Sequence, residues 1–493
     1  MKYYIGADLG TSSLKLLLVN KNGEILNSVS KSYDVIYPKN GWSEQNPYDW
    51  WNAFVEGTKE LIMDVNGDDI AAIGVSGQMH GLVVLDECGE VIRNTILWND
   101  SRTQNAVNYL NNVIGKEKLS KYTANIAFAG FTAPKFLWLK ENEPENFKKI
   151  SKFMLPKDYI NYRLTGVHAT DYSDAAGTLL LDVKNKCWSK EMLDICSVKD
   201  EWCPKLYESY EIVGTVKEDV AKILGIGKNT MVIAGAADNA GAAIGTGTFG
   251  DGRCNISIGT SGTVLVTSQN FPSAEGNELH AFSHSDAGFY LMGCMLSAAS
   301  CNKWFCENVL LTDDYGKESE KIDESLLGKN SVFFLPYLTG ERSPINDTDA
   351  SGVFIGLTPT TTKSEMLLAI FEGVAFAIRD SIEVAKSIGV NISKSKICGG
   401  GAKSPLWRKI FANVLNLELE IPNVEEGPSF GAAILCMIAS GEYKSLYECA
   451  EKLIKCKNTI QPDQTLSSLY EERYEKFKKI YPAIKNLYKE LKK

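Results

Sequence analysis

Two short turns far apart in the sequence share the residues Gly-Thr-Ser, and each lies between segments rich in β-forming residues. The first turn follows Lys2–Ala7 and the second follows Cys254–Ile258. Glycine has no Cβ and successive backbone amides form an anion-binding concavity, so a polyphosphate can approach such a turn closely. One copy would be weak evidence, because Gly and Ser are ordinary turn residues. Two copies predict two related domains that hold one polyphosphate between them.

Two aspartates directly follow predicted strands. Asp8 ends the first strand just before the first turn, where it could hold Mg²⁺ directly or through water; the alternative is a turn-capping Asp. Asp238 follows the predicted strand Met231–Gly235 and stands among small residues. A hydroxyl that attacks a γ-phosphate needs a base within hydrogen-bonding reach, and Asp238 suits that role. Its alternative role is that of a helix N-cap, and both roles can hold at once.

Polar and aromatic side chains follow two further strand-like segments. Met79 and His80 lie in a glycine-flanked turn, where a neutral imidazole could bind a polyol hydroxyl; a structural histidine is the alternative. Trp98, Asp100 and Arg102 form a second cluster, in which the indole could stack on the apolar face of a sugar. The alternative for the second cluster is a surface Asp–Arg pair of little energetic value.

A third glycine-rich turn lies in the second half of the chain. The segment 399–402 ends a predicted strand, and Ser404 precedes a predicted helix over 405–415. Such a turn lets the backbone approach an adenine or ribose beside a helix N-terminus. The turn lacks the Lys-Ser/Thr of a P-loop and the spacing of a dinucleotide fold, so by itself it is weak evidence.

Length and composition favour a globular protein of two domains. The chain has 493 residues, which is too long for one hydrophobic core. Its residues are 44% hydrophobic and 23% charged, which is ordinary for a globular protein. The net charge of −9 argues against nucleic acid or an anionic membrane as the main partner. No signal peptide or membrane span is expected, and the twelve cysteines show no Cys-x-x-Cys pair, so we expect reduced thiols and a cytoplasmic location.

The order of elements predicts an α/β protein with two sheets flanked by helices and a ligand cleft between them. A strand meander fills the first 35 residues, and a helix is predicted over 48–65. A long helix is predicted over 364–387, with Ser364 as its N-cap. The small-residue run after Asp238 marks the domain boundary, which gives domains 1–247 and 248–493.

Motifs in order from residue 8 to about 433 resemble the FGGY family of carbohydrate kinases. In the first half they are 8–12, 41–45, 77–81, 97–100, 131–135, 155–159 and 173–178. In the second half they are 258–262, 335–338, 340–342 and the glycine turn. Within the family, the blocks 77–81 and 42–45 look most like those of xylulose kinases.

The resemblance implies the two-domain fold of actin, hexokinase and the chaperone ATPases, which is ribonuclease H-like, with a mobile interdomain cleft. It implies ATP and Mg²⁺, with Asp238 as the general base and with Asp8, together with Asp238, positioning the metal ion. The expected sugar-binding residues are Met79, His80, Asp238, Asn239, Trp98 and Asp100. The expected ATP-binding residues are Gly10, Thr11, Ser12, Ser13, Gly259, Thr260, Ser261, Gly400, Gly401, Ala402 and Ser404.

The resemblance further implies phosphorylation of a ketopentose, D-xylulose first, at its C5 hydroxyl. No nucleophilic His or Cys stands beside the phosphate turns, so direct in-line transfer is expected. Two alternatives remain: a sister kinase for L-ribulose, L-xylulose, gluconate or glycerol, and an actin-like or chaperone-like ATPase. Homodimers are common in the family, but nothing in the sequence locates an interface.

Overall fold

Two mixed sheets that share the arrangement of their central strands form the frame of the protein, which is described here from a computed structural model covering residues 2–272, 278–423 and 427–491. In each sheet a β-hairpin is followed by a strand parallel to its first arm, and an antiparallel pair closes one edge. The first sheet runs β13 (Ile212–Thr215), β14 (Met231–Ile233), β5 (Ile70–Gly77), β1 (Tyr3–Leu9), β2 (Ser13–Asn20) and β3 (Ile25–Ser32), with β15 (Ala236–Ala237) also paired to β5. The second runs β24 (Cys456–Ile460), β23 (Glu418–Pro422), β22 (Lys394–Cys398), β16 (Arg253–Ile258), β17 (Gly262–Ser268), β19 (Phe289–Met295) and β18 (His280–Ser283). The repeated topology confirms the two-sheet α/β architecture expected from the sequence.

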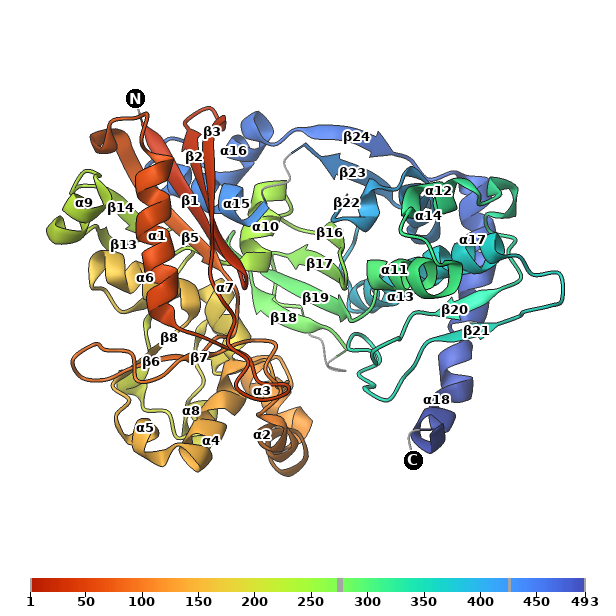
Figure 1. The fold of residues 1–493 in the computed structure, drawn as a ribbon, viewed down its shortest axis with the longest axis horizontal. Coiled ribbons are helices and arrows are strands. Elements are labelled where there is room, and N and C mark those ends of the chain that lie inside the picture. Colours follow the sequence, from red (N-terminus) through yellow and green to blue (C-terminus); the bar gives the residue numbers. More distant parts are fainter. Residues whose placement is uncertain (1, 273–277, 424–426, 492–493) are drawn as a thin grey trace.

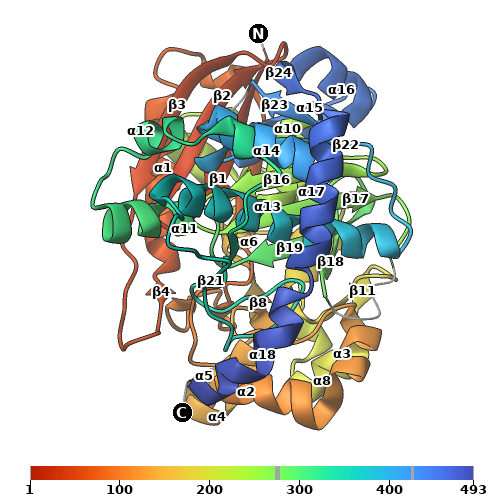
Figure 2. The ribbon, with the colours of Figure 1, turned by 90° about the vertical axis from the view of Figure 1, so that its right-hand side faces the viewer.

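Helices cover both sheets, and Figure 1 shows them on the outer sides of the two halves as well as between them. On the first half they are α1 (Pro47–Leu61), α6 (Pro156–Thr165) and α9 (Glu218–Leu224). On the second half they are α11 (Ala299–Phe305), α12 (Tyr315–Glu320), α13 (Lys363–Ser387), α14 (Pro405–Leu415), α17 (Gln464–Phe477) and α18 (Ile480–Leu491). Figure 2 shows α17 and α18 running along the outer side of the second half. The hairpin β20 (Phe333–Leu335) and β21 (Val353–Ile355) packs near α13.

A smaller lobe extends below the first sheet in Figure 1 and comes mostly from residues 82–207. Its strands are β4 (Glu44–Gln45), β6 (Val83–Leu85), β7 (Thr95–Ile96), β8 (Lys152–Met154), β9 (Ala169–Asp171), β10 (Leu181–Asp182), β11 (Cys187–Trp188) and β12 (Lys205–Tyr207). Its helices are α2 (Gln104–Asn108), α3 (Lys116–Thr123), α4 (Thr132–Asn142), α5 (Pro144–Lys148), α7 (Tyr172–Ala175) and α8 (Lys190–Cys196).

Two helix starts show how local chemistry fixes the elements. The helix α14 begins as expected, with Pro405 in its first turn and the Ser404 hydroxyl accepting a hydrogen bond from the backbone N–H of Trp407. The expected N-cap of α13 was wrong by two residues. Thr362 is the cap, and it forms a capping box with Glu365, in which each side chain accepts from the backbone N–H of the other residue.

The helices α10 (Asp238–Thr246) and α15 (Gly427–Ala439) cross between the two sheets, and α15 also packs on β1 and β5 of the first sheet. A Cβ on Gly431 would lie 1.9 Å from the carbonyl oxygen of Gly241. A Cβ on Gly6 would likewise lie 2.0 Å from the carbonyl oxygen of Ser429. Although α15 comes from the second half of the sequence, its apolar face therefore belongs to the core of the first sheet. The domain boundary after residue 247 stays a prediction.

Gly431→Ala tests how tightly this crossing is packed. The added methyl group meets backbone of α10, which has no rotamer with which to move aside, so we expect the free energy of unfolding to fall by about 1 to 3 kcal/mol. Urea denaturation measures this change. The control is Gly214→Ala in β13, where a Cβ meets nothing closer than 3.4 Å. Equal stability of the two variants would show that the helices can separate at no cost.

Candidate active site

The carboxyl ends of three neighbouring strands of the first sheet bring the predicted site residues together. The parallel strands β1 and β5 pair Leu9 with Gly77, and β15 continues this register by pairing Ala237 with Gly77. The next residue of each strand is therefore Gly10, Gln78 or Asp238, at one edge of the sheet. Neighbouring strands lie about 4.8 Å apart, so the first Gly-Thr-Ser turn and the predicted base, which are separated by β5, lie about 10 Å apart at the same edge of the sheet.

Asp8 and Asp238 are two carboxylates whose ionised forms are poorly stabilised. Burial raises the pKa of Asp238 to about 6, although its carboxylate accepts from the backbone N–H of Asn239 at 2.7 Å. Burial, and then the charge of Asp238, raises the pKa of Asp8 to about 7. One carboxylate oxygen of Asp8 is buried and has no hydrogen-bond partner. A proton or a bound cation would therefore stabilise this pair of carboxyl groups.

Met79, His80 and Asn239 lie together beside Asp238. The Asn239 amide nitrogen is 3.9 Å from the Met79 sulfur. His80 has a left-handed backbone with φ of 71°, and its Nδ1 lies 2.6 Å from the carbonyl oxygen of Gly177. Burial, and then the charge of Lys135, lowers the pKa of His80 to about 3. The imidazole is therefore neutral, and because Nδ1 donates to a carbonyl, Nε2 is an acceptor for a hydroxyl group.

A ring of polar side chains holds the first Gly-Thr-Ser turn. The Thr11 hydroxyl donates to Gln78 at 3.2 Å, and the Gln78 amide donates to Gln45 at 2.9 Å. The Gln45 amide returns to the backbone oxygen of Thr11 at 2.6 Å. The exposed Trp98 indole donates to the Thr11 hydroxyl at 3.0 Å, so Trp98 stands beside the phosphate turn. Trp98 was expected from the sequence to bind the sugar, whereas neither glutamine was expected to have a role.

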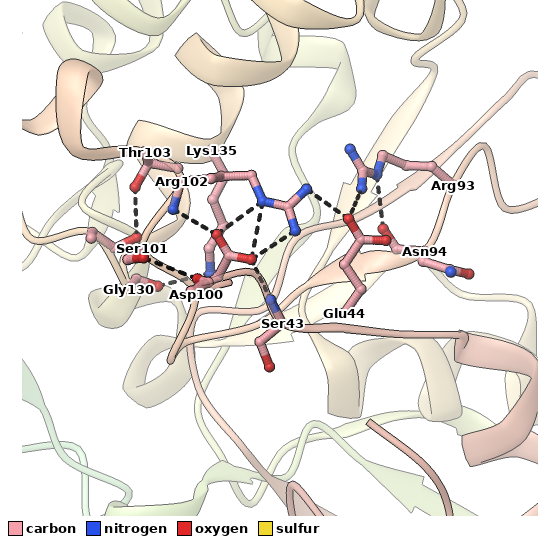
Figure 3. A network of polar contacts seen from close by, with 12 residues as sticks. Ser43, Glu44, Arg93, Asn94, Asp100, Ser101, Arg102, Thr103, Gly130 and Lys135 are labelled. Carbon is pink, nitrogen blue, oxygen red and sulfur yellow. Dashed lines mark hydrogen bonds and ion pairs between the residues drawn. The ribbon is translucent and has the colours of Figure 1, made fainter. Parts of the chain in front are cut away.

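Asp100 lies in a buried ion-pair network, shown in Figure 3. Its carboxylate accepts from the Arg102 guanidinium at 2.7 Å and from the backbone N–H of Ser43 at 2.6 Å. Arg102 also pairs with Glu44 at 2.6 Å, which in turn pairs with Arg93. The contacts of Asp100 are those of a structural residue. Its expected part in sugar binding stays a prediction that these contacts do not favour, and the pair is buried rather than on the surface.

The second Gly-Thr-Ser turn and the glycine turn meet at the corresponding edge of the second sheet. The parallel strands β16 and β22 pair Ser257 with Cys398, so both turns leave the sheet side by side. A cavity of about 760 Å³ opens there between the turns and α11, α12 and α14. It is lined by Gly259, Thr260, Ala299, Ser300, Asn302, Lys303, Tyr315, Gly400, Gly401, Ser404 and Trp407, among others. The cavity is large enough for an adenosine and adjoins the phosphate turn.

The remaining predicted nucleotide residues are placed less uniformly. Ser12 and Ser13 lie at the tip and at the start of the second arm of the first hairpin. The backbone N–H of Gly10 already donates to the oxygen of Ser13, and that of Gly259 donates to Ser261, so these two amides are committed within their turns. Ala402 faces a different cavity, of about 880 Å³, on the other side of the glycine turn.

A buried cluster behind Asp238 was not given a role from the sequence. The Lys157 ammonium lies 2.6 Å from Asp158 and 2.9 Å from Asp171, with all three side chains fully buried. Lys157 also donates to the oxygen of Ala234 at 3.3 Å, and the Ser173 hydroxyl accepts from the N–H of Ala237 at 3.0 Å. The cluster thus braces the segment that ends at Asp238. The family motifs at 155–159 and 173–178 include most of these residues, but only the side-chain contacts show that they hold the segment before Asp238.

Comparisons with known proteins give the family. The model of the FGGY family of carbohydrate kinases, N-terminal domain, matches residues 3–245, and that of the C-terminal domain matches residues 254–440. The chain belongs to the FGGY family of carbohydrate kinases. It is 40% identical to a xylulose kinase of Bacillus subtilis over 100% of this chain and 99% of that protein. It is 38% identical to a xylulose kinase of Escherichia coli over 98% and 99%.

Solved structures of this family share the fold. A ligand-bound xylulose kinase from Lactobacillus acidophilus matches with a TM-score of 0.93 at 29% identity, over 100% of both chains. A gluconate kinase from the same organism matches with a TM-score of 0.93 at 29% identity, over 99% of both chains. The FGGY membership and the fold class expected from the motifs are confirmed. Overall similarity of fold does not distinguish these two sugars.

No helix in the described parts of the chain is both long and apolar enough to cross a membrane. Among the same residues, no group of three or more His, Cys, Asp or Glu side chains is arranged to hold a metal ion. Mg²⁺ is commonly held by one or two carboxylates together with phosphate oxygens and water. The Asp8 oxygen that lacks a partner suits such a site, which a bound nucleotide would complete.

Asp238→Asn tests the electrostatic cost of the site. The folded-state pKa of about 6 exceeds the ordinary 3.8, so the stability contributed by this group is present below about pH 4 and lost as the pH rises through 6. We expect the variant to be more stable than the parent by about 1 to 3 kcal/mol at pH 8 and equally stable near pH 3.5. Urea denaturation at the two pH values measures this, with Asp64→Asn at an exposed position as control. A variant that is no more stable at pH 8 would contradict the burial argument.

Asp100→Ala tests the structural assignment of the network in Figure 3. Removal of one partner of a buried pair leaves Arg102 with Glu44 as its remaining acidic partner, so we expect a loss of about 3 to 5 kcal/mol in the free energy of unfolding. Glu145→Ala breaks an exposed pair with Lys148 and should leave stability unchanged. If Asp100→Ala were instead fully stable with a raised KM for the sugar, the sugar-binding role would be correct.

Proposed function

We propose that the protein is an ATP-dependent kinase that phosphorylates D-xylulose to D-xylulose 5-phosphate. The observation that carries the proposal is the shared strand-end position of the first Gly-Thr-Ser turn and Asp238, with Met79, His80 and Asn239 beside the carboxylate. The near full-length similarity to xylulose kinases supports the choice of sugar. A cytoplasmic location and the absence of nucleic-acid and membrane partners belong to the same proposal.

The roles of the side chains follow from their placement. Asp238 takes the proton from the sugar hydroxyl as that hydroxyl attacks the γ-phosphate of ATP in line. Desolvation raises its pKa to about 6, which makes it a better proton acceptor than an ordinary aspartate yet leaves it ionised at neutral pH. The Nε2 atom of neutral His80 accepts a hydrogen bond from a sugar hydroxyl, and Asn239 lies beside the same pocket.

The nucleotide lies across both halves in this proposal. The adenosine occupies the cavity beside Gly400, Gly401 and Ser404, and the phosphates reach from the turn at 259–261 to the turn at 10–13. Asp8 and Asp238 would hold Mg²⁺, which when bound would neutralise charge on the phosphate oxygens. Trp98, hydrogen-bonded to Thr11, shields the first turn from one side.

The test of the proposed function is ADP release with Mg-ATP over a panel of D-xylulose, L-xylulose, D- and L-ribulose, gluconate and glycerol. We expect strong turnover on D-xylulose. Asp238→Ala should lower kcat by about 10²- to 10⁴-fold, because a positioned base contributes that much. His80→Ala should mainly raise the sugar KM, because it removes a binding contact.

Other results of this assay would redirect the proposal. Turnover on a different sugar would keep the base and reassign the pocket. ATP hydrolysis at full rate without any sugar would favour an ATPase that couples nucleotide turnover to partner binding, because water fills the acceptor site of a sugar kinase poorly. Near-normal kcat in Asp238→Ala would exclude Asp238 as the base.

A further inference from the structure

Arg342 comes from the second half of the chain, in the connection between β20 and β21, and its backbone is firmly held. The Glu341 carboxylate accepts from the backbone N–H groups of Leu296 at 2.9 Å and of Arg342 at 2.8 Å. The N–H of Ser343 donates to the oxygen of Cys294 on β19 at 2.9 Å. The Arg342 side chain therefore projects from a fixed point beside the end of β19.

The guanidinium of Arg342 faces side chains of the first half. It lies 5.1 Å from the centroid of the Phe128 ring and interacts with the Cys294 thiol. Its charge acts on the imidazoles of both His80 and His280, in each case as a smaller effect than burial. Arg342 is thus connected to the predicted sugar-binding histidine through two rings, because Phe128 lies 5.7 Å from Phe131, which in turn lies 4.7 Å from His80.

Rings from both halves form one cluster around this point. The centroid of Phe131 is 4.7 Å from that of His80 and 5.6 Å from that of His280, and Phe128 is 5.0 Å from His280. The edge strand β18, which carries His280, is tied to the first half because Asn125 exchanges hydrogen bonds with the backbone of Ala281 at 2.8 and 3.2 Å. Residues of both halves are therefore held together in this cluster by hydrogen bonds as well as by ring packing.

In the described residues, Arg342 lacks an acidic partner and one ring nitrogen of His280 lacks a hydrogen-bond partner. Arg342 has no carboxylate within 4.0 Å, whereas the buried guanidinium groups of Arg102 and Arg473 are both paired with acids. His280 is only 4% exposed, and its Nε2 atom has no hydrogen-bond partner. A half-buried cation without an acidic partner and a buried imidazole nitrogen without a hydrogen bond are costly unless a polar ligand satisfies them.

The position of Arg342 relative to Asp238 gives the orientation of such a ligand. Cys294 connects the two places, because its backbone oxygen accepts from the N–H of Ser343, next to Arg342, and it packs against the apolar cluster that contains Met79 and Ala237, the residue before Asp238. The phosphate turns lie on the Asp238 side, at the strand ends of the sheets. A sugar whose acceptor hydroxyl is at Asp238 therefore extends past Met79 and His80 toward Arg342.

We propose that Arg342 binds the carbonyl end of an open-chain ketose and so helps to select ketoses in this pocket. The inference rests on the proposed function, in which the far end of the sugar from C5 carries the C2 carbonyl and the C1 hydroxyl. A guanidinium group only donates hydrogen bonds, and a carbonyl oxygen only accepts them, so the two match directly. Reduction of C2 to an alcohol changes its geometry and adds a competing donor. The second half of the chain thus contributes to the sugar site as well as to the nucleotide site.

The experiment compares D-xylulose with xylitol, which lacks the carbonyl group, in the full-length protein and its Arg342→Gln and Arg342→Lys variants. A lost hydrogen bond to a charged group is worth about 1.5 to 3 kcal/mol, so we expect the KM for D-xylulose to rise at least tenfold in Arg342→Gln. The preference for D-xylulose over xylitol should fall by a similar factor, with the KM for ATP within twofold of the parent. Arg342→Lys keeps the charge and should recover part of the affinity.

The control is Arg253→Gln, at the start of β16 and at the opposite end of that strand from the phosphate turn, which should change none of these values. An unchanged sugar KM in a folded Arg342→Gln variant would overturn the proposal, as would an equal rise in the KM for ATP. Calorimetric binding of D-xylulose without ATP separates the two levels of inference. If the parent protein binds no D-xylulose, the proposed function is contradicted. If the parent and Arg342→Gln bind D-xylulose equally well, only the proposed role of Arg342 is contradicted.

Discussion

The close crossing of α10 and α15 is the constraint on which the rest of the structure depends. The helix α10 begins at Asp238, so the position of the proposed base is fixed by whatever fixes α10. Because Gly241 and Gly431 have no side chains, the backbones of the two helices are in direct contact at the crossing, and a Cβ on Gly431 would overlap the backbone of α10. Since α15 also packs on the first sheet, it joins that sheet to the second half of the chain. A small shift here would move the base relative to both phosphate turns.

Buried charged groups in the walls of the cleft form close ion pairs, whereas the two buried acids at the cleft itself have raised pKa values. The pairs of Lys157 with Asp158 and of Arg102 with Asp100 compensate each other at short range, and they hold backbone segments in place. For Asp8 and Asp238, burial outweighs the charges and hydrogen bonds that lower the pKa, so both carboxyl groups keep a raised pKa. Walls built from paired charges are stable, whereas two buried acids with raised pKa values cost stability when they are ionised and no ligand is present. That difference is typical of a site whose chemistry needs a proton acceptor or a cation.

The proposed sugar site draws on both halves, as the nucleotide site does. Met79 and His80 come from the strand ends of the first sheet, while His280 reaches the same cluster from the edge strand of the second sheet and Arg342 from the connection between β20 and β21. The hydrogen bonds between Asn125 and Ala281 hold this edge to the first half. In this arrangement, recognition of the sugar and orientation of the two halves depend on each other.

The sequence by itself determined the elements whose signals are local. Strand-to-turn patterns marked Asp8, Asp238 and both Gly-Thr-Ser turns, because glycine and small polar residues at a strand end need no distant partner to be read. Local reading erred where two caps competed: Thr362 rather than Ser364 begins α13, because only Thr362 has a glutamate three residues later. Only the tertiary structure decided which long side chains face the cleft. It joined Arg102 to Glu44 and placed Arg342 over the Phe128 ring, since such contacts join residues far apart in sequence and depend on how whole sheets pack.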